Sequence, residues 1–386
     1  MKLLAISKAS HISVNRDIYE TLARHYNYEV KLIIPSYLTI GNKKIEHEAI
    51  RDSAIDVLPL TMLGANRYSR YEGILGVLRL SKHDIVYFED DPMTLLAIFL
   101  GLWCQCNNVK FVCRTNQNRS LLLQDEIKRL GFFKGFLSSR IKLLLLRLSK
   151  NLFHHLFAIS NDGIEIFYEL GVTNVSKIPL GFNEDIFQIN NNEREVLRER
   201  LSLNTTVIAY MGRISESKGV HILIEALDKI RNEEWIFLID SFELYADTYK
   251  KKIDSMIDSF SLKERTIFFD ANHTEIAKYM NASDIIVMPS MTTNSFKEEY
   301  GRIAPEGMGS GCLMVVSNSG TLPELVSDYG WVFPESDINA LALLLKSLIN
   351  NENKRDLGQR ASVYARSKLG LKKQASIMNK VFQDIV

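Results

Sequence analysis

The chain has 386 residues, a length that suggests two domains at roughly 150 residues each. Its residues are 46% hydrophobic and 24% charged with a formal net charge of +1, the composition of a soluble globular protein without the charge excess that indicates nucleic acid. Four cysteines, of which only Cys104 and Cys106 lie close together, predict neither a disulfide framework nor a zinc site and fit a reducing, cytoplasmic setting.

The apolar runs of the sequence are short. Residues 1–13 hold too short an apolar run for a signal peptide and predict a first buried strand instead. The longest apolar candidate, residues 93–103, falls well short of the ~20 residues that a transmembrane helix needs. We therefore expect a chain that does not span a membrane.

Short apolar runs alternate with helical patterns along the whole chain. The strands expected in the first half are residues 3–6, 30–34, 55–58, 85–88, 109–113 and 156–159. The strands expected in the second half are residues 207–211, 236–239, 266–269, 285–288, 313–316 and 331–333. This alternation is typical of parallel α/β sheets with right-handed crossovers. Gly181 and the Asn-rich run 190–192 mark the best linker between the two sets.

Polar loops follow the strands expected at residues 3–6 and 85–88. The loop after the first strand contains His11 but no Gly-x-Gly-x-x-Gly, which argues against a nicotinamide enzyme. His11 would either donate a hydrogen bond to a substrate or simply be solvated. Strand 85–88 runs into Asp90 and Asp91, which could orient a substrate hydroxyl because strand ends line the ligand crevice of such sheets. A metal-binding Asp pair and a solvated acidic turn are the alternatives.

Residues 128–153 combine a helical apolar pattern with a surplus of positive charge. The apolar positions are Phe133, Leu137, Ile141, Leu144, Leu148 and Leu152. The basic ones are Lys128, Arg129, Lys134, Arg140, Lys142, Arg147 and Lys150. A basic amphipathic helix of this kind predicts peripheral contact with an anionic membrane. The alternative is a core helix whose Lys and Arg side chains reach past apolar neighbours to water.

The segment after strand 207–211 reads Gly212-Arg213-Ile214-Ser215-Glu216-Ser217-Lys218-Gly219 and opens a helix. Arg213 can clamp phosphate oxygens in a bidentate fork, and Lys218 adds a mobile point charge. This loop therefore predicts phosphate binding.

A second strand, loop and helix follow in residues 285–309. Backbone N–H groups at a helix start attract anions, which favours phosphate beside Gly301, Arg302 and Ile303. Glu298 and Glu306 flank that point, and a carboxylate can accept hydrogen bonds from two hydroxyls at once. The combination predicts a sugar-nucleotide site, with an exposed acidic loop before an ordinary helix as the alternative.

Two motifs carry a resemblance to a known family. Glu298 and Glu306 with seven residues between them, Tyr300-Gly301, and the later Pro323-Glu324 turn resemble the signature of retaining GT-B glycosyltransferases of family 4. The Gly-Arg…Lys-Gly element at 212–219 is similar to the second motif of that family. The resemblance implies an α/β GT-B fold of two Rossmann-like domains facing a central cleft. It implies an acceptor-side domain 1–183, onto which a C-terminal helix at about 370–386 packs, and a nucleotide-sugar domain 184–369.

The same resemblance implies retaining transfer of a sugar from a nucleotide diphosphate sugar to a hydroxyl of a glycan or lipid-linked glycan, in surface polysaccharide biosynthesis and without metal or cofactor. Arg213 and Lys218 would bind the diphosphate, helped by Gly212 and the backbone of residues 301–303. Glu298 would hold the sugar hydroxyls and Glu306 the ribose. The acceptor-side candidates are His11, Asp90, Asp91, Arg114, Asn116 and Asn118.

The chain also departs from the family pattern. Its first loop lacks paired glycines. Asp240-Ser241 stands where relatives carry a Gly-rich turn, and residues 269–273 stand where relatives receive the nucleobase. The sequence therefore does not predict which nucleobase the donor carries. A GT-B nucleotide-sugar 2-epimerase is one alternative function. A non-catalytic GT-B partner subunit is another, although such a subunit would be expected to lose Arg213, Lys218 or one of the two Glu residues.

Overall fold

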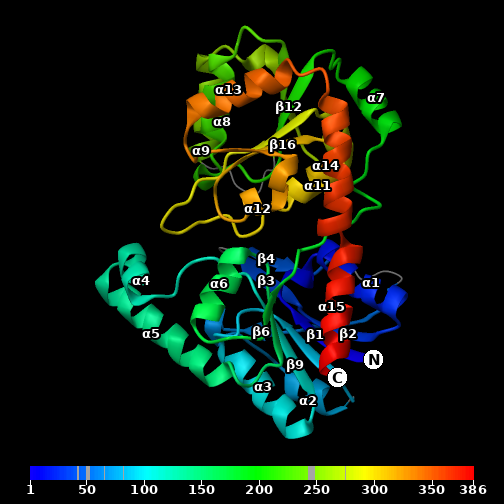
Figure 1. Cartoon of the computed structure of the whole chain (residues 1–386), viewed down its shortest axis with the longest axis vertical. Helices are drawn as coiled ribbons and strands as arrows, with labels where there is room; N and C mark the ends of the chain where they lie inside the picture. The colour runs from blue at the N-terminus through cyan, green and yellow to red at the C-terminus, as the bar shows by residue number, and fades with distance from the viewer. Residues whose placement is uncertain (41–42, 49–52, 65, 81, 242–247, 274) are drawn as a thin grey trace. The chain divides into compact units, whose positions relative to one another are not determined.

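The computed structural model describes residues 1–386 except 41–42, 49–52, 65, 81, 242–247 and 274 (Figure 1). The chain divides into two compact units. The first unit comprises Met1–Gly181 and Leu371–Val386, and the second comprises Phe182–Gly370. The division expected from the sequence was 1–183 with 370–386 against 184–369.

The first unit is built on a parallel sheet of seven strands in the order β11-β10-β9-β8-β1-β2-β5. Its strands are β1 Lys2–Ser7, β2 Glu29–Pro35, β5 Asp56–Leu60, β8 Ile85–Glu89, β9 Lys110–Thr115, β10 His155–Ala158 and β11 Val175–Lys177. Short antiparallel pairs, β3 Tyr37–Ile40 with β4 Lys43–Glu46 and β6 Met62–Leu63 with β7 Arg70–Tyr71, lie outside this sheet. Residues 3–6 of the central strand are at most 1% exposed, as expected for a parallel strand covered on both faces.

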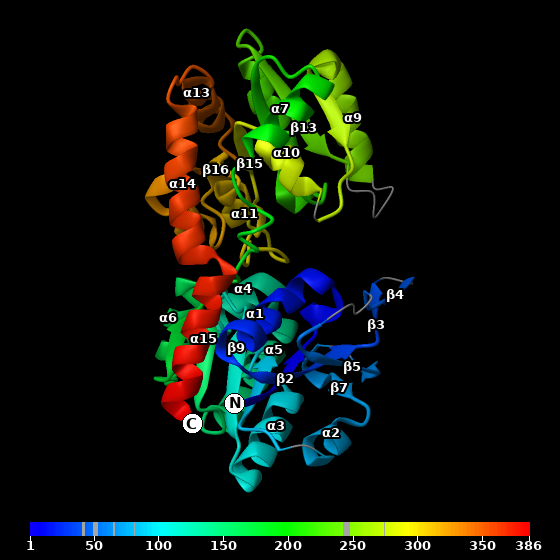
Figure 2. The same ribbon diagram turned by 90° about the vertical axis from the view of Figure 1, so that its right-hand side faces the viewer.

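Helices cover both faces of this sheet (Figure 2). They are α1 Asp17–Tyr26, α2 Ile74–Leu80, α3 Leu95–Asn107, α4 Leu123–Leu130, α5 Phe132–Ser149, α6 Asn161–Glu169 and α15 Leu371–Ile385. Helix α15 packs beside α1 and inserts Phe382 among Tyr28, Tyr87 and Phe157, with ring centroids 5.9–6.4 Å apart. The Gln374 Oε1 atom also accepts a 2.7 Å hydrogen bond from the Gly181 N–H. The last helix of the chain is therefore part of the first unit's core.

The second unit holds a parallel sheet of six strands in the order β14-β13-β12-β15-β16-β17. Its strands are β12 Thr206–Tyr210, β13 Trp235–Asp240, β14 Thr266–Phe269, β15 Ile285–Met288, β16 Leu313–Ser317 and β17 Trp331–Phe333. Its helices are α7 Asn191–Arg200, α8 Val220–Lys229, α9 Thr248–Ser259, α10 Ile276–Ala282, α11 Ile303–Gly309, α12 Leu322–Val326, α13 Ile338–Ile349 and α14 Lys354–Leu369.

Both sheets reverse their strand order once. In the second unit the reversal lies between β12 and β15, and in the first between β1 and β8, which is the doubly wound Rossmann order. Ligands of such sheets bind at the carboxyl ends of the strands at this switch point. The predicted class of two Rossmann-like α/β domains is confirmed, whereas the central cleft between them stays a prediction. Over the described residues, no helix combines the length and the apolar character needed to cross a membrane.

Candidate active site

Two loops meet at the switch point of the second sheet. Residues 211–219 follow β12, and residues 289–302 follow the neighbouring strand β15. The Met291 N–H donates a 2.8 Å hydrogen bond to the Ser217 carbonyl oxygen, which ties the loops together. Gly219 has a φ of +67°, and a Cβ atom there would collide with the Pro289 carbonyl oxygen. The close approach of the two backbones therefore requires glycine.

An ion pair joins these loops across 80 positions of sequence. The Lys218 Nζ atom lies 2.6 Å from the Glu298 Oε2 atom and 4.9 Å from the centre of the Phe296 ring. The Ser290 hydroxyl donates a 2.7 Å hydrogen bond to the same carboxylate oxygen. Glu298 is 5% exposed, so this pair is largely withdrawn from water. The structure thus brings together two of the residues predicted from separate motifs.

The backbone of Glu298 is clamped from the other side. Its carbonyl oxygen accepts a 3.3 Å hydrogen bond from the Thr321 N–H, in the turn after β16. Gly320 has a φ of +55°, and a Cβ atom there would collide with the Glu298 carbonyl oxygen. Ser290 and Gly320 therefore set the position of Glu298, although the sequence motifs alone did not assign them a role. In the sequence, Ser290 is marked only by its place just after the strand 285–288. Gly320 is marked only by its place before the Pro323-Glu324 turn.

Glu306 is a buried carboxylate with unused hydrogen-bonding capacity. It lies in α11, is 2% exposed, and has its Oε1 atom 3.6 Å from the Arg302 Nε atom. That oxygen has no hydrogen-bond partner among the residues that the structure describes. Burial raises the pKa of Glu306 to about 7, and the Arg302 guanidinium opposes part of this shift. A ligand hydroxyl that reached this oxygen would offset part of the cost of burying it.

The glycines of the two motifs have distinct local tasks. Gly301 has a φ of +61° and packs against Leu322 and Met288, where a Cβ atom would crowd both side chains. It thereby turns the chain from the loop into Ile303, the first residue of α11. Gly212 has a φ of +123°, and its N–H donates a 3.4 Å hydrogen bond to the buried Asp240 carboxylate.

Arg213 differs from Lys218, the other cation of its motif, in its contacts. Its side chain is exposed and makes no hydrogen bond or ion pair with any residue in the described part of the chain. Its carbonyl oxygen accepts a 2.6 Å hydrogen bond from the Tyr210 hydroxyl, which fixes the backbone there. Lys218 is therefore paired with a carboxylate, whereas the side chain of Arg213 is exposed to an incoming anion.

The switch point of the first sheet holds a second buried cluster. The Arg114 Nη1 atom at the end of β9 lies 2.8 Å from the Glu89 Oε1 atom at the end of β8, and both side chains are less than 10% exposed. The other Glu89 oxygen accepts a hydrogen bond from the Ser7 hydroxyl at the end of β1. Arg114, an acceptor-side candidate, is therefore paired inside the unit, and its pairing with Glu89 was not foreseen.

The remaining acceptor-side candidates differ in exposure. Asp91 accepts a hydrogen bond from the Thr115 hydroxyl, and burial raises its pKa to about 6. Burial also raises the pKa of Asp90, whose Oδ1 atom accepts a 2.8 Å hydrogen bond from the Asp91 N–H. Asn116 is exposed and Asn118 is 4% exposed. The half-exposed His11 ring has its Nδ1 atom 3.2 Å from the Lys8 carbonyl oxygen.

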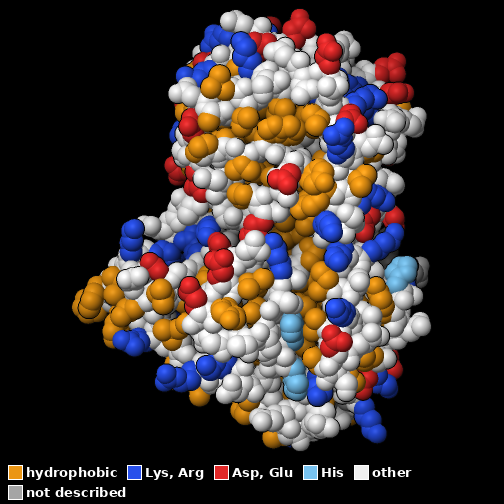
Figure 3. Space-filling view, viewed as in Figure 1, with side chains coloured by type: hydrophobic (Ala, Val, Ile, Leu, Met, Phe, Trp, Pro, Cys, Tyr) orange, Lys and Arg blue, Asp and Glu red, His pale blue; other side chains and the backbone are white. Residues whose placement is uncertain are grey.

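The predicted basic amphipathic segment forms two helices, α4 and α5. The apolar side chains exposed on α5 are Phe132, Phe133, Phe136, Leu137, Leu144 and Leu148, at 43–86% of their surface. Lys142 and Arg129 instead pair with the buried Glu126, at 3.0 and 2.7 Å. Figure 3 shows hydrophobic side chains gathered at the free end of α4 and α5 with basic side chains beside them. Leu145 and Leu146 of the same helix are buried in the core of the first unit, so α5 has one packed face and one exposed apolar face.

No group of three or more His, Cys, Asp or Glu side chains is placed to hold a metal ion within the residues that the structure describes.

Sequence comparison identifies a family that matches the second unit and relatives that match up to two thirds of the chain. Residues 192–367 match the family described as Glycosyl transferases group 1. The chain is 24% identical over 285 residues to an uncharacterized glycosyltransferase of Methanocaldococcus jannaschii, an alignment covering 68% of this chain and 65% of the relative. It is 24% identical over 181 residues to the capsular polysaccharide biosynthesis glycosyltransferase CapM of Staphylococcus aureus, covering 46% and 45%. The chain thus spans about half to two thirds of the length of these relatives.

Solved structures match over the full length. A glycosyltransferase from Rickettsia africae superposes with a TM-score of 0.74 at 16% identity, covering 100% of this chain and 98% of that one. HepE of Anabaena, solved in complex with UDP-glucose, superposes with a TM-score of 0.68 at 18% identity, covering 99% and 100%. At these identities the likeness establishes the fold. Residues 192–367 thus match the group 1 glycosyltransferases, and the chain as a whole has the fold of the solved glycosyltransferases of the GT-B type.

Proposed function

We propose that the chain is a retaining glycosyltransferase of family 4, which transfers a sugar from a nucleotide diphosphate sugar to a hydroxyl of a glycan or lipid-linked glycan in surface polysaccharide biosynthesis. The observation that carries the proposal is the pairing of Lys218 with Glu298 at the switch point of the second sheet. The names of the relatives support it, since CapM is described as acting in capsular polysaccharide biosynthesis. The complex of HepE with UDP-glucose supports a nucleotide-sugar donor.

Donor binding would exchange the contact between Lys218 and Glu298 for contacts with the donor. Lys218 would turn from Glu298 to the diphosphate, where exposed Arg213 adds a second positive charge. Glu298, released from Lys218 but still bonded to Ser290, would accept the hydroxyls of the sugar. The free oxygen of Glu306 would accept hydrogen bonds from the ribose. Gly212 and the backbone of residues 301–303 would complete the diphosphate site.

The chemical step would then depend on electrostatics. As the bond between the sugar and the phosphate breaks, negative charge grows on the leaving diphosphate, and Lys218 and Arg213 stabilise it more strongly than in the ground state. The acceptor hydroxyl attacks from the same face of the sugar and gives its proton to the leaving phosphate, so the configuration is retained. These two cations are the reason that we propose transfer without a metal ion or other cofactor.

The acceptor would be held by residues at the switch point of the first sheet. Asp90 and Asp91 lie at the carboxyl end of β8, where a half-buried carboxylate can accept a hydrogen bond from a sugar hydroxyl. His11, Arg114, Asn116 and Asn118 are the other acceptor-side candidates. The exposed Phe and Leu side chains of α5, with Lys134, Arg140 and Arg147 between them, would rest on an anionic membrane at its cytoplasmic face.

A panel of nucleotide sugars tests the proposed activity. Full-length protein is incubated with each donor and a panel of glycan and lipid-linked acceptors, and released nucleotide and modified acceptor are both measured. The proposal requires acceptor-dependent nucleotide release with at least one donor and an α- or β-linkage that matches the donor's own. Conversion of the donor into its 2-epimer would identify an epimerase instead. Binding of glycan or lipid without turnover of any donor would indicate a non-catalytic partner subunit.

A further inference from the structure

A cavity of about 300 Å³ opens in the second unit, away from the two donor loops. Its wall includes Ser283 and Asp284, which precede β15, and Ser310 and Gly311, which precede β16. Lys218 and Glu298 lie beyond the opposite, carboxyl ends of the neighbouring parallel strands β12 and β15. The cavity therefore lies at the amino ends of the strands of this sheet, and the donor loops lie at their carboxyl ends.

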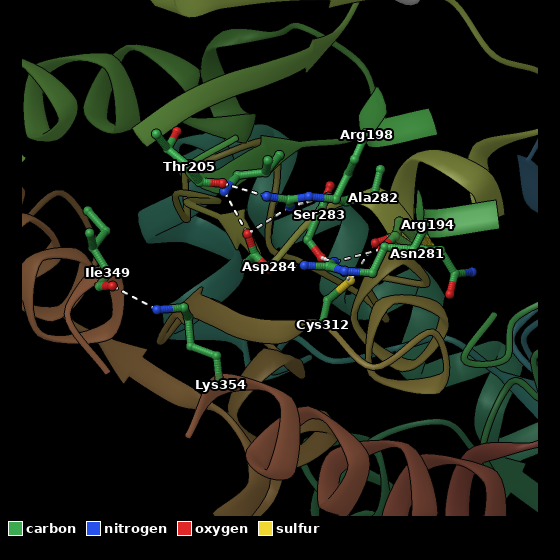
Figure 4. A network of polar contacts seen from close by, with 12 residues as sticks. Arg194, Arg198, Thr205, Asn281, Ala282, Ser283, Asp284, Cys312, Ile349 and Lys354 are labelled. Carbon is green, nitrogen blue, oxygen red and sulfur yellow. Dashed lines mark hydrogen bonds and ion pairs between the residues drawn. The ribbon is translucent and has the colours of Figure 1, made fainter. Parts of the chain in front are cut away.

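Positive charge predominates around this cavity. Three of its lining residues, Arg194, Lys354 and Arg355, are basic, and Asp284 is its only acidic lining residue among those that the structure describes. Asp284 accepts from Arg194 at 2.5 Å and from Arg198 at 3.1 Å (Figure 4), so its negative charge is already shared by two guanidinium groups. Nothing acidic in the lining then remains to balance Lys354 and Arg355.

The two unbalanced cations are held in different ways. The Lys354 Nζ atom donates to the carbonyl oxygens of Ile349 and Asn351 at 2.7 and 2.8 Å, which fixes its position and leaves one ammonium proton for another acceptor. Arg355 is exposed and forms no ion pair with a described residue. Both lie in the first turn of α14, where the helix dipole adds to their positive potential, the reverse of the usual placement of cations.

An adjoining cavity gives an internal comparison. It measures about 540 Å³, shares Asp284 and Lys354 with the first, and adds the carboxylates of Glu233 and Glu234. Its lining therefore has more carboxylates than cations, whereas the smaller cavity has more cations than carboxylates. Of the two, only the smaller cavity would attract an anion.

We propose that the smaller cavity is a binding site for a phosphate monoester of a small sugar or similar metabolite, separate from the donor site. Its phosphate would contact Arg355 and the remaining proton of Lys354, two charge-assisted interactions that suit phosphate oxygens. The polar side chains of Asn191, Gln359 and Ser310 in the same wall would bind the rest of the ligand. The volume is about ten times the ~30 Å³ that one water molecule occupies in the liquid, enough for a small organic phosphate but not for a polymer.

Calorimetric titration of the full-length protein with glucose 6-phosphate, inorganic phosphate and citrate tests this site. We expect saturable binding of glucose 6-phosphate, with inorganic phosphate binding more weakly and citrate binding most weakly. Arg355→Gln should weaken glucose 6-phosphate binding by about tenfold or more, because a charge-assisted hydrogen bond is lost. Arg360→Gln is the matched control, since Arg360 lies on the same helix, pairs with Asp356 at 2.9 Å and does not line the cavity. It should change the Kd less than twofold.

Two further variants keep the test decisive. Gln359→Glu adds a negative charge to the lining and should also weaken binding, which covers the case that Arg355→Gln alters the fold. Arg213→Gln should leave the Kd unchanged if the ligand avoids the donor loops. The proposal is overturned if the native protein does not bind glucose 6-phosphate, if citrate binds more tightly, if Arg355→Gln and Arg360→Gln act equally, or if only Arg213→Gln weakens binding.

Discussion

Lys218, Ser290 and Thr321 all hold Glu298 in place. Lys218 and Ser290 contact its carboxylate, and the Thr321 N–H bonds its carbonyl oxygen. In the proposed mechanism this carboxylate contacts only the sugar part of the donor. Its removal should therefore impair transfer far more than nucleotide binding.

We predict that Glu298→Ala lowers kcat by about 100-fold or more while the Kd for the product nucleotide changes less than threefold, on the scale found when one group that stabilises a transition state is removed. Initial rates and nucleotide titration of the same preparation measure both quantities. Ser290→Ala is the graded control, since it removes one hydrogen bond to the carboxylate and should have a smaller effect on kcat. An equal loss of rate and nucleotide affinity in Glu298→Ala would contradict the assigned role.

Glu306 should make both stability and donor affinity depend on pH. Its pKa of about 7 is above the ordinary value of 4.5, so between these limits the folded chain holds a proton that the unfolded chain releases. The free energy of unfolding should therefore fall as pH rises from about 4.5 to 7. Donor affinity should rise over the upper part of this range, because the ionised carboxylate is the form that accepts two ribose hydroxyls.

The measurements are urea unfolding and donor titration between pH 5 and pH 8, in the native chain and in Glu306→Gln. The variant cannot ionise at this position, so its stability should lose the part of the pH dependence that falls across this range, and its donor affinity should stay low and flat. Identical pH profiles in the two proteins would show that another group titrates.

A local motif points to individual side chains, but it does not predict the contacts that folding makes between them. Lys218 and Glu298 were both expected from local motifs, yet their direct contact depends on β12 and β15 being neighbours in the sheet, which no local pattern states. Arg114 looked like an open strand-end residue but is buried against Glu89. Its partner lies 25 positions earlier, at the end of another strand. Apolar periodicity carries no information on such a pairing.

At the scale of elements, the apolar runs were the reliable signal. Each predicted strand overlaps a strand of one of the two parallel sheets, because parallel strands need continuous apolar runs to be covered on both faces. The short strand β11, Val175–Lys177, and the small antiparallel pairs were missed. Most of their described side chains are exposed or only partly buried, and their sequences lack a long apolar run.

Gly219 should be needed for the contact between the two donor loops. Gly219→Ala forces a side chain into the left-handed region and against the Pro289 carbonyl oxygen, and we expect a loss of about 2 kcal/mol or more in stability together with a loss of nucleotide binding. Gly73→Ala is the matched control, because Gly73 has a φ of +76° with nothing within 4 Å of a Cβ atom. It should cost only the backbone strain, about 1 kcal/mol, and leave binding intact. Equal effects in urea unfolding would rule out the steric contact.

Helix α5 should bind anionic membranes through its exposed apolar side chains. Flotation of the full-length protein with phosphatidylglycerol vesicles at low salt should recover most of it, and phosphatidylcholine vesicles should recover little. Phe133→Ser with Leu137→Ser removes two side chains that are 86% and 60% exposed, and it should lower the bound fraction by about tenfold. Leu343→Ser, at a 69% exposed leucine of the second unit, should have no effect. Absence of native binding would remove the membrane proposal.

At the scale of the whole molecule, the chain passes from the first unit into the second after Gly181 and returns after Gly370. Phe182 and Gly370 form a parallel bridge within the second unit, while Gly181 and Gln374 are bonded within the first. At both connections between the units, the chain is therefore bonded to its own unit directly beside the connecting residues. The first unit depends for its core on a helix that is synthesised only after the entire second unit.

This arrangement predicts two separable unfolding transitions. Phe382→Ala empties a fully buried position between Tyr87 and Phe157 and should destabilise the first unit by about 3–5 kcal/mol. Phe333→Ala, at a 1% exposed position in the core of the second unit, is the matched control and should shift only the other transition by a similar amount. Differential scanning calorimetry of the two variants assigns the transitions. If either variant moved both transitions equally, the two units would unfold as one, and the core of each would have to be stabilised by the presence of the other.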